Sequence, residues 1–132
     1  MKRFLNLAFY PLLAILVFNF FFKGTAEANG SQAYEQLLAG KAVFLDIREK
    51  DEVASGMIKG AQWLPLSTLK GDPTTTMRKL KDLMKEKELY VYCRSGRRAD
   101  SFLTEVKSHG IKGLNLGGYE DLVTQGLPSQ KP

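Results

Sequence analysis

One stretch of this chain constrains its fold more than any other, because an apolar run, a charged loop and an amphipathic run follow one another without a break. Residues 88–92 are rich in β-branched and aromatic side chains and predict a buried strand, and residues 99–109 have the apolar spacing of a helix. Residues 93–98 therefore join the carboxyl end of a strand to the beginning of a helix. In an α/β sheet this is where ligands bind, because the first amide groups of a helix are unpaired and attract anions.

The residues of this loop predict a reactive cysteine. The loop holds the only cysteine of the chain and three of its arginines, in the order Cys93, Arg94, Ser95, Gly96, Arg97 and Arg98. A sulfur beside amide groups and arginines should ionise more easily than a free thiol, and the thiolate is the nucleophile. A lone cysteine is more often an inert buried residue, but such a residue needs no arginines around it. Because cations are disfavoured at a helix N-terminus unless an anion is bound there, the loop predicts a cysteine that attacks an anionic substrate.

Four motifs resemble those of the rhodanese-like sulfurtransferases, in the order of that family. They are Asp46-Ile47-Arg48-Glu49, residues 56–61 followed by Pro65-Leu66, the loop 93–98, and Gly117-Gly118-Tyr119 with Gly126-Leu127-Pro128. Each motif alone is weak, but together they are specific and span nearly all of the chain after residue 30. The resemblance implies a small three-layer α/β fold, in which helices flank a central, mainly parallel sheet of five strands.

The resemblance also implies a chemistry for Cys93. The cysteine takes a sulfane sulfur from thiosulfate or a similar small anionic donor, becomes a persulfide, and passes the sulfur to cyanide or a thiol. Arg94, Arg97 or Arg98 would hold the donor, and the amides of residues 94–98, with Ser95 and Gly96 in the turn, would hold the persulfide. The alternative is a persulfide carrier or sulfur-sensing binding module that does not turn over.

Loop length separates this chemistry from that of related enzymes. Four residues stand between Cys93 and Arg98, as in the sulfur-transferring members of the family. Related dual-specificity phosphatases of the cell-cycle type carry one residue more, because a phosphate group needs a wider cradle than a sulfur atom. A phosphatase or arsenate reductase is therefore the less favoured prediction.

Asp46 and Arg48 are predicted to support the loop. Residues 42–47 form an apolar run that predicts a buried strand, and parallel strands bring their carboxyl ends to one edge of a sheet. Asp46 would accept hydrogen bonds from an arginine or from the loop backbone. The alternative is a surface ion pair between Asp46 and Arg48, worth less than about 1 kcal/mol.

A histidine base beside the cysteine is not expected. Family members commonly have a histidine at the position of Met57, and His109 is the only histidine of this chain. His109 precedes a glycine, which predicts the carboxyl end of a helix. Trp63, in the predicted strand 61–64, is expected in the core, and the alternative is a place at the mouth of the pocket.

The amino-terminal residues predict export. Residues 1–3 are basic, residues 4–22 are almost entirely apolar, and Ala26-Glu27-Ala28 fits the pattern read by signal peptidase. We expect cleavage after Ala28 and a periplasmic or secreted single domain over residues 29–132, similar in build to exported family members of the phage shock protein E type. The alternative is an uncleaved membrane anchor, since the apolar run is close to the ~20 residues that span a bilayer.

The composition of the chain limits the classes of partner that we expect. Without residues 1–28, which carry a net charge of +2, the net charge falls from +5 to +3, which is too mild to suggest nucleic acid. The sequence has no metal-ligand cluster or nucleotide-binding loop. We therefore expect a monomer without a cofactor. The remaining patterns predict helices at residues 30–39, 49–54 and 77–84, a strand at 114–116, and a frayed end at 129–132.

Overall fold

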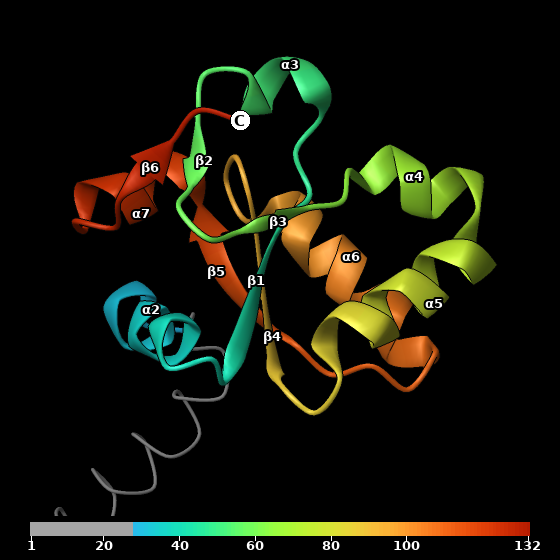
Figure 1. The fold of residues 1–132 in the computed structure, drawn as a ribbon. Coiled ribbons are helices and arrows are strands. Elements are labelled where there is room, and N and C mark those ends of the chain that lie inside the picture. The colour runs from blue at the N-terminus through green and yellow to red at the C-terminus, as the bar shows by residue number, and fades with distance from the viewer. Residues whose placement is uncertain (1–27) are drawn as a thin grey trace, which may run out of the picture.

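Figure 1 shows a computed structural model of the chain, which describes residues 28–132. A parallel sheet forms the middle layer, in the order β3 (Gln62–Trp63), β1 (Ala42–Asp46), β4 (Glu88–Cys93) and β5 (Leu114–Gly118). The predicted α/β class with a parallel sheet is confirmed, and residues 28–132 contribute four strands to this sheet where five were predicted.

The two remaining strands of the described residues pair with each other outside this sheet. β2 (Met57–Ile58) and β6 (Ser129–Gln130) form an antiparallel ladder. Each strand is only two residues long, and both side chains of β6 are exposed, so β6 lacks the apolar faces that a strand inside a parallel sheet requires. The predicted fraying of residues 129–132 is wrong for β6.

Helices cover both faces of the sheet (Figure 1). α2 (Gly30–Leu38) and α7 (Tyr119–Thr124) pack on one face, and α4 (Leu66–Gly71), α5 (Pro73–Met84) and α6 (Arg97–Ser108) pack on the other. The short helix α3 (Lys50–Val53) follows β1 at the edge where the parallel strands end. The helices predicted at α2, α3, α5 and α6 are confirmed, whereas the sequence patterns do not predict α4 and α7.

β1 and β4 are buried on both faces, which explains why their sequences are almost continuously apolar. Alternate side chains enter the two cores: Phe44 packs with α2 and α7, whereas Leu45 packs with α4, α5 and α6. Cys93, the last residue of β4, belongs to the second of these cores. The loop that follows therefore begins with a sulfur that points toward the α6 face of the sheet.

Local signals fix several boundaries. Asn29 caps α2 by accepting hydrogen bonds from the amides of Ser31 (3.0 Å) and Gln32 (3.2 Å), and His109 ends α6 as predicted.

Trp63 is 43% exposed, so its predicted place in the core is wrong. The physical reason is that β3 is an edge strand, with β1 as its one neighbour in the part of the chain that the structure describes.

The predicted signal peptide or anchor, residues 1–28, lies outside the described residues except for Ala28. Among residues 28–132, no helix combines the length and apolar character that crossing a bilayer requires.

Candidate active site

The loop 93–98 lies at the carboxyl end of β4 and leads directly into α6, as predicted. Gly96 is the N-cap of α6 and has a φ of 94°, a left-handed conformation that favours glycine. Its amide donates a hydrogen bond to Cys93 Sγ at 3.1 Å, and its carbonyl accepts one from the amide of Asp100. This tight turn bends the loop back over the sulfur, and the Cys93 residue is completely buried.

β5 braces the underside of the loop. A Cβ atom on Gly118 would collide with the carbonyl oxygen of Arg94, so only glycine allows the two backbones to approach this closely. Asn115 Nδ2 donates to the Gly96 carbonyl and to Asp100 Oδ1, both at 2.8 Å, and Asn115 Oδ1 accepts from the Gly117 amide at 2.8 Å. Asn115 was not among the predicted site residues, because no local pattern marks an asparagine in a neighbouring strand as a brace.

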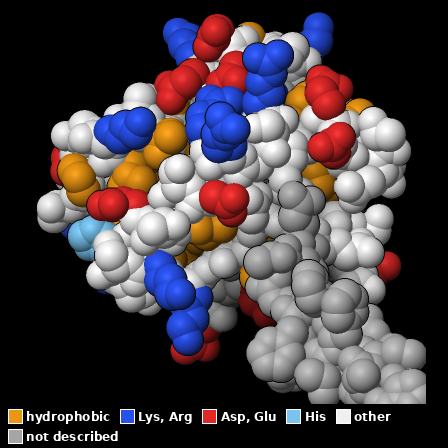
Figure 2. Space-filling model, turned by 180° about the vertical axis from the view of Figure 1, so that it is seen from behind, with side chains coloured by type: hydrophobic (Ala, Val, Ile, Leu, Met, Phe, Trp, Pro, Cys, Tyr) orange, Lys and Arg blue, Asp and Glu red, His pale blue; other side chains and the backbone are white. Residues whose placement is uncertain are grey.

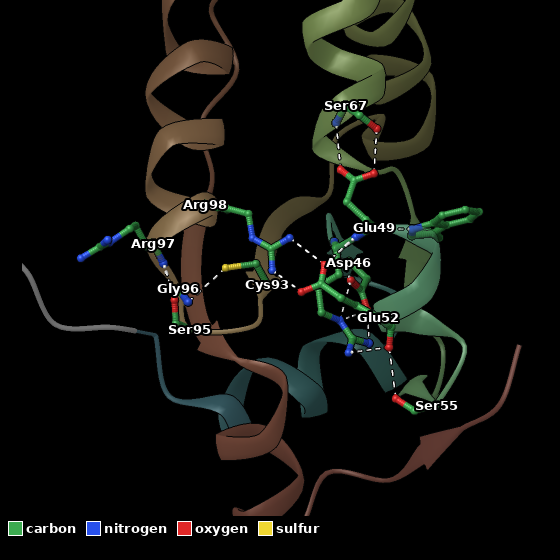
Figure 3. Close-up of polar contacts among 12 residues, drawn as sticks. Asp46, Glu49, Glu52, Ser55, Ser67, Cys93, Ser95, Gly96, Arg97 and Arg98 are labelled. Atoms are coloured by element: carbon green, nitrogen blue, oxygen red, sulfur yellow. Dashed lines mark hydrogen bonds and ion pairs between the residues drawn. The ribbon is translucent and has the colours of Figure 1, made fainter.

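The three arginines of the loop differ in their surroundings. Arg94 and Arg97 are exposed and form no ion pair with any residue in 28–132. Arg98 turns back toward α3, where its two terminal nitrogens donate to the two carboxylate oxygens of Glu52 at 2.7 and 2.6 Å (Figure 3). In the space-filling view, basic side chains gather near the top of the molecule and acidic ones lie among them (Figure 2). The arginines that remain free to meet a small anion are therefore Arg94 and Arg97.

Glu52 is the second residue that sequence reasoning missed. Its hydrogen bond from Arg98, reinforced by a bond from the Glu49 amide and by the positive charge of Arg98, lowers its pKa to about 2. The same Glu52 bond, together with the charges of Glu52 and Cys93, raises the pKa of Arg98 against the opposing effect of burial. The pair is therefore ionised on both sides at neutral pH, and Arg98 lies within electrostatic reach of the cysteine.

Further hydrogen bonds hold α3 in place. The Glu49 amide donates to Glu52 Oε2 at 2.9 Å in a capping box, and Glu49 Oε2 accepts from Ser67 Oγ at 2.8 Å (Figure 3). The Ser67 amide also donates to Glu49 Oε1 at 3.2 Å. Glu52 is thus presented to Arg98 from a helix that is tied to the beginning of α4.

Asp46 and Arg48 form a buried pair and not a surface pair, so the surface alternative is wrong. Arg48 Nε lies 3.1 Å from both Asp46 carboxylate oxygens, and Arg48 Nη2 lies 2.8 Å from Oδ2. Arg48 also donates to the carbonyls of Gly56 (2.6 Å) and Glu52 (3.3 Å), and its guanidinium lies 4.1 Å from the ring centroid of Tyr119. Burial alone would lower the pKa of Arg48, but the hydrogen bonds and the charge of Asp46 outweigh it and raise that pKa.

The link from this pair to the loop is indirect. Within residues 28–132, neither side chain forms a hydrogen bond to residues 93–98, and the bonds of Arg48 go to the backbone of α3 and its following turn. α3 in turn carries Glu52, which binds Arg98. The structure therefore brings Asp46 and Arg48 close to the predicted site, since Asp46 pairs with Tyr92 beside Cys93, but their hydrogen-bonded link to the loop runs through α3.

The arrangement suits a nucleophilic sulfur and a small anion. Loop amides and the guanidiniums of Arg94 and Arg97 offer positive partners, and Cys93 is the only thiol. No group of three or more potential metal ligands occurs among the described residues. A hollow of about 580 Å³ lies between the second half of α6 and the beginning of β5, but no residue of the loop lines it. The chemistry therefore centres on the loop itself.

Comparisons with known proteins agree with this geometry. Residues 30–125 match the family model described as a rhodanese-like domain. The chain is 31% identical to a sulfurtransferase of Allochromatium vinosum over 106 residues, which cover 77% of this chain and 92% of that protein. It is 32% identical to the protein YtwF of Bacillus subtilis over 93 residues, 70% of this chain and 84% of that protein. A solved structure of a rhodanese-related protein from Thermoplasma volcanium superposes with a TM-score of 0.63 at 25% identity and covers 79% of this chain and 96% of that one.

Proposed function

The chain belongs to the rhodanese-like domain family, and on this premise we propose that it is a sulfurtransferase in which Cys93 carries the sulfur. One observation carries the proposal: the amide of Gly96 donates to Cys93 Sγ at 3.1 Å inside a six-residue loop that also holds three arginines. An amide directed at sulfur stabilises negative charge on it, which both the attacking thiolate and the persulfide require.

The first half-reaction uses thiosulfate or a similar anionic donor. The Cys93 thiolate attacks the outer sulfur of thiosulfate and forms a new S–S bond. The S–S bond of the donor breaks, and sulfite leaves with the electron pair. The enzyme then holds a persulfide anion, so the total charge is the same before and after the step.

The second half-reaction returns the enzyme to its thiolate. Cyanide in an assay, or a thiol in the cell, attacks the outer sulfur of the persulfide and takes it away, and the Cys93 sulfur keeps the electron pair. With cyanide the product is thiocyanate. Because the donor product leaves before the acceptor binds, ping-pong kinetics follow.

Arg94 and Arg97 are the residues we assign to the first contact with the donor. Both guanidiniums are exposed and free of ion pairs with residues 28–132, so an oxyanion can approach them without displacing a partner. Asp46 and Arg48 are assigned an indirect supporting role, because Arg48 binds the backbone of the helix that carries Glu52. The amino-terminal pattern of residues 1–28 supports export of the domain, as an extension of this proposal.

A persulfide carrier is the second candidate, favoured by one observation: the Cys93 residue is completely buried. A buried persulfide is protected from small acceptors and would wait for a protein that reaches it. Such a module would accept sulfur from a donor but release little thiocyanate.

The test is the mass of the intact protein after incubation with thiosulfate, followed by thiocyanate release on addition of cyanide. Wild type should gain about 32 Da, the mass of one sulfur atom, and then release thiocyanate rapidly, whereas Cys93→Ser should do neither. A stable adduct with negligible turnover would favour the carrier. No adduct with any sulfane donor would rule out both candidates.

A further inference from the structure

The loop presents an apparent contradiction, because its nucleophile is out of contact with solvent. The Cys93 residue has an exposed fraction of 0% and belongs to the core formed with α6. A donor must nevertheless touch Sγ before any bond can form. Some part of the loop or its surroundings therefore has to make way when a donor arrives.

Arg98 is the side chain best placed to control that access. It leaves the first turn of α6 and ends at Glu52 of α3, so that it joins the helices on either side of Cys93 in the view of Figure 3. The side chains of Arg98 and Glu52 are 31% and 23% exposed, so solvent reaches this bridge, whereas Cys93 is buried. Of the polar contacts drawn around Cys93 Sγ, the one bond to the sulfur itself comes from the Gly96 amide.

The bond between Arg98 and Glu52 resembles the bond that an oxyanion donor would make. A guanidinium presents a planar fork of N–H groups, and the same fork accepts a carboxylate, a sulfonate or a phosphate with two parallel hydrogen bonds. Glu52 fills this fork with bonds of 2.7 and 2.6 Å. The carboxylate therefore stands where the charged end of an anionic donor would bind to Arg98.

We propose that Glu52 is a specificity-determining residue, whose carboxylate occupies Arg98 until an anion replaces it and thereby opens the way to Cys93. This inference rests on the proposed function, because it describes which donors reach the sulfur. A dianion such as thiosulfate brings two negative charges and can compete with a carboxylate for the guanidinium. A neutral molecule brings no charge to Arg98 and leaves the bridge closed.

The partial exposure of the pair makes such an exchange feasible. A buried ion pair would resist opening, because separating it leaves a charge away from water. A pair with about a quarter to a third of each side chain exposed is screened by water and contributes little net stability. An incoming anion can therefore displace Glu52 from Arg98, and the ion pair does not close the site permanently.

The proposal is tested by alkylation of Cys93, the only cysteine of the chain. The full chain is treated in parallel with iodoacetate, which is anionic, and iodoacetamide, which is neutral, and the ratio of the two rates is compared with that of Glu52→Gln. The ratio is informative because any change in the ionisation of the thiol affects both reagents equally. The glutamine keeps the side-chain oxygen that accepts from the Glu49 amide, so the cap of α3 is retained.

We expect Glu52→Gln to raise the iodoacetate to iodoacetamide ratio about fivefold, since it removes a negative charge and leaves Arg98 uncompensated near the sulfur. Glu105→Gln, which removes an exposed carboxylate later in α6, should leave the ratio within about twofold of wild type. Ser67→Ala, which loosens α3 without touching Arg98, should also leave the ratio unchanged. Arg98→Lys keeps the charge but loses the fork, and should raise both alkylation rates.

Two results would overturn the proposal: a wild-type ratio in Glu52→Gln, or an equal rise in Glu52→Gln and Ser67→Ala, which would trace the effect to movement of α3. If Glu52→Gln does not fold, unchanged alkylation rates in Arg98→Lys would overturn it instead. Alkylation does not depend on sulfur transfer. A shifted ratio in a protein that takes no sulfur from thiosulfate would therefore refute the proposed function and leave the control of access by Glu52 supported.

Discussion

The two arginine–carboxylate pairs around α3 have the same chemistry and very different surroundings. Asp46 and Arg48 are two residues apart and their side chains are 0% and 4% exposed. Glu52 and Arg98 are 46 residues apart and their side chains are 23% and 31% exposed. Both arginines bind α3, but Arg48 binds its backbone and Arg98 binds a side chain.

Burial gives the two pairs different roles. Arg48 satisfies Asp46 and two backbone carbonyls and lies over the ring of Tyr119, so it fixes the position of α3 and the following turn. Among residues 28–132, Arg98 has one side-chain partner, Glu52, which is partly exposed and lies beside the reactive loop. The same guanidinium group thus makes a fixed structural contact where water is excluded, and a contact that can exchange where water is present.

The largest effect should come from breaking the buried pair. Arg48→Met leaves the Asp46 carboxylate buried without its guanidinium partner, and should lower the free energy of unfolding by about 3–5 kcal/mol. Urea denaturation at neutral pH measures this loss. The double variant Asp46→Leu with Arg48→Met removes both charges and should recover part of it. A loss below about 1 kcal/mol in the single variant would show that the pair behaves as a surface pair.

A smaller but more local effect is expected where β5 supports the loop. In Gly118→Ala the added methyl group would meet the Arg94 carbonyl, so the loop must shift. We expect the free energy of unfolding to fall by about 1–3 kcal/mol, and the rate of thiocyanate formation to fall at least tenfold. Gly71→Ala is the matched control, because a Cβ at Gly71 meets no atom within 4 Å. Equal stability and activity in the two variants would contradict the close contact between Gly118 and the loop.

The Asn115 brace should matter somewhat less, because it holds the loop by hydrogen bonds and not by exclusion. Asn115→Ala leaves the Gly96 carbonyl and the Gly117 amide without this partner. It should lower the free energy of unfolding by about 1–2 kcal/mol. Amide hydrogen exchange in residues 94–98 should rise at the same time. Unchanged exchange in the loop would mean that Asn115 stabilises β5 alone.

The loop could be predicted from the sequence because its chemistry is contiguous. Six neighbouring residues, bounded by a buried strand and a helix, are enough to place Cys93 and Gly96 correctly at the turn. The runs that form β1 and β4 were equally clear, because strands buried on both faces are apolar throughout.

Contacts between distant residues could not be predicted in this way. Glu52 meets Arg98 across 46 residues, and Asn115 meets Gly96 across 19, so neither leaves a periodic signal. The prediction for Trp63 was wrong for a related reason, because its size suggests burial but β3 lies at the edge of the sheet. The indole donates to the Arg48 carbonyl at 2.8 Å, and the residue remains 43% exposed. α7 is only six residues long and follows two glycines, which gave no helical periodicity to detect.

The smallest effect on stability should come from the exposed pair, and its pH dependence sharpens the contrast with the buried one. Arg98 lowers the pKa of Glu52 from 4.5 to about 2, chiefly through its hydrogen bonds, so the folded protein holds this carboxylate ionised more strongly than the unfolded chain does. Its contribution to stability is therefore present above the unfolded pKa, and it is lost as the pH falls toward the folded value. We expect wild type to exceed Glu52→Gln by less than about 1 kcal/mol at pH 7, because both side chains are partly exposed.

Urea denaturation of wild type and Glu52→Gln between pH 7 and pH 3 measures this difference. It should be constant down to about pH 5 and then shrink as the pH falls below 4.5, toward zero near the folded pKa of about 2. A difference that grows on acidification would contradict the assignment of the lowered pKa to Glu52. A difference of several kcal/mol at neutral pH would mean that the bridge is as firmly fixed as the buried pair, and such a bridge could not exchange with a donor.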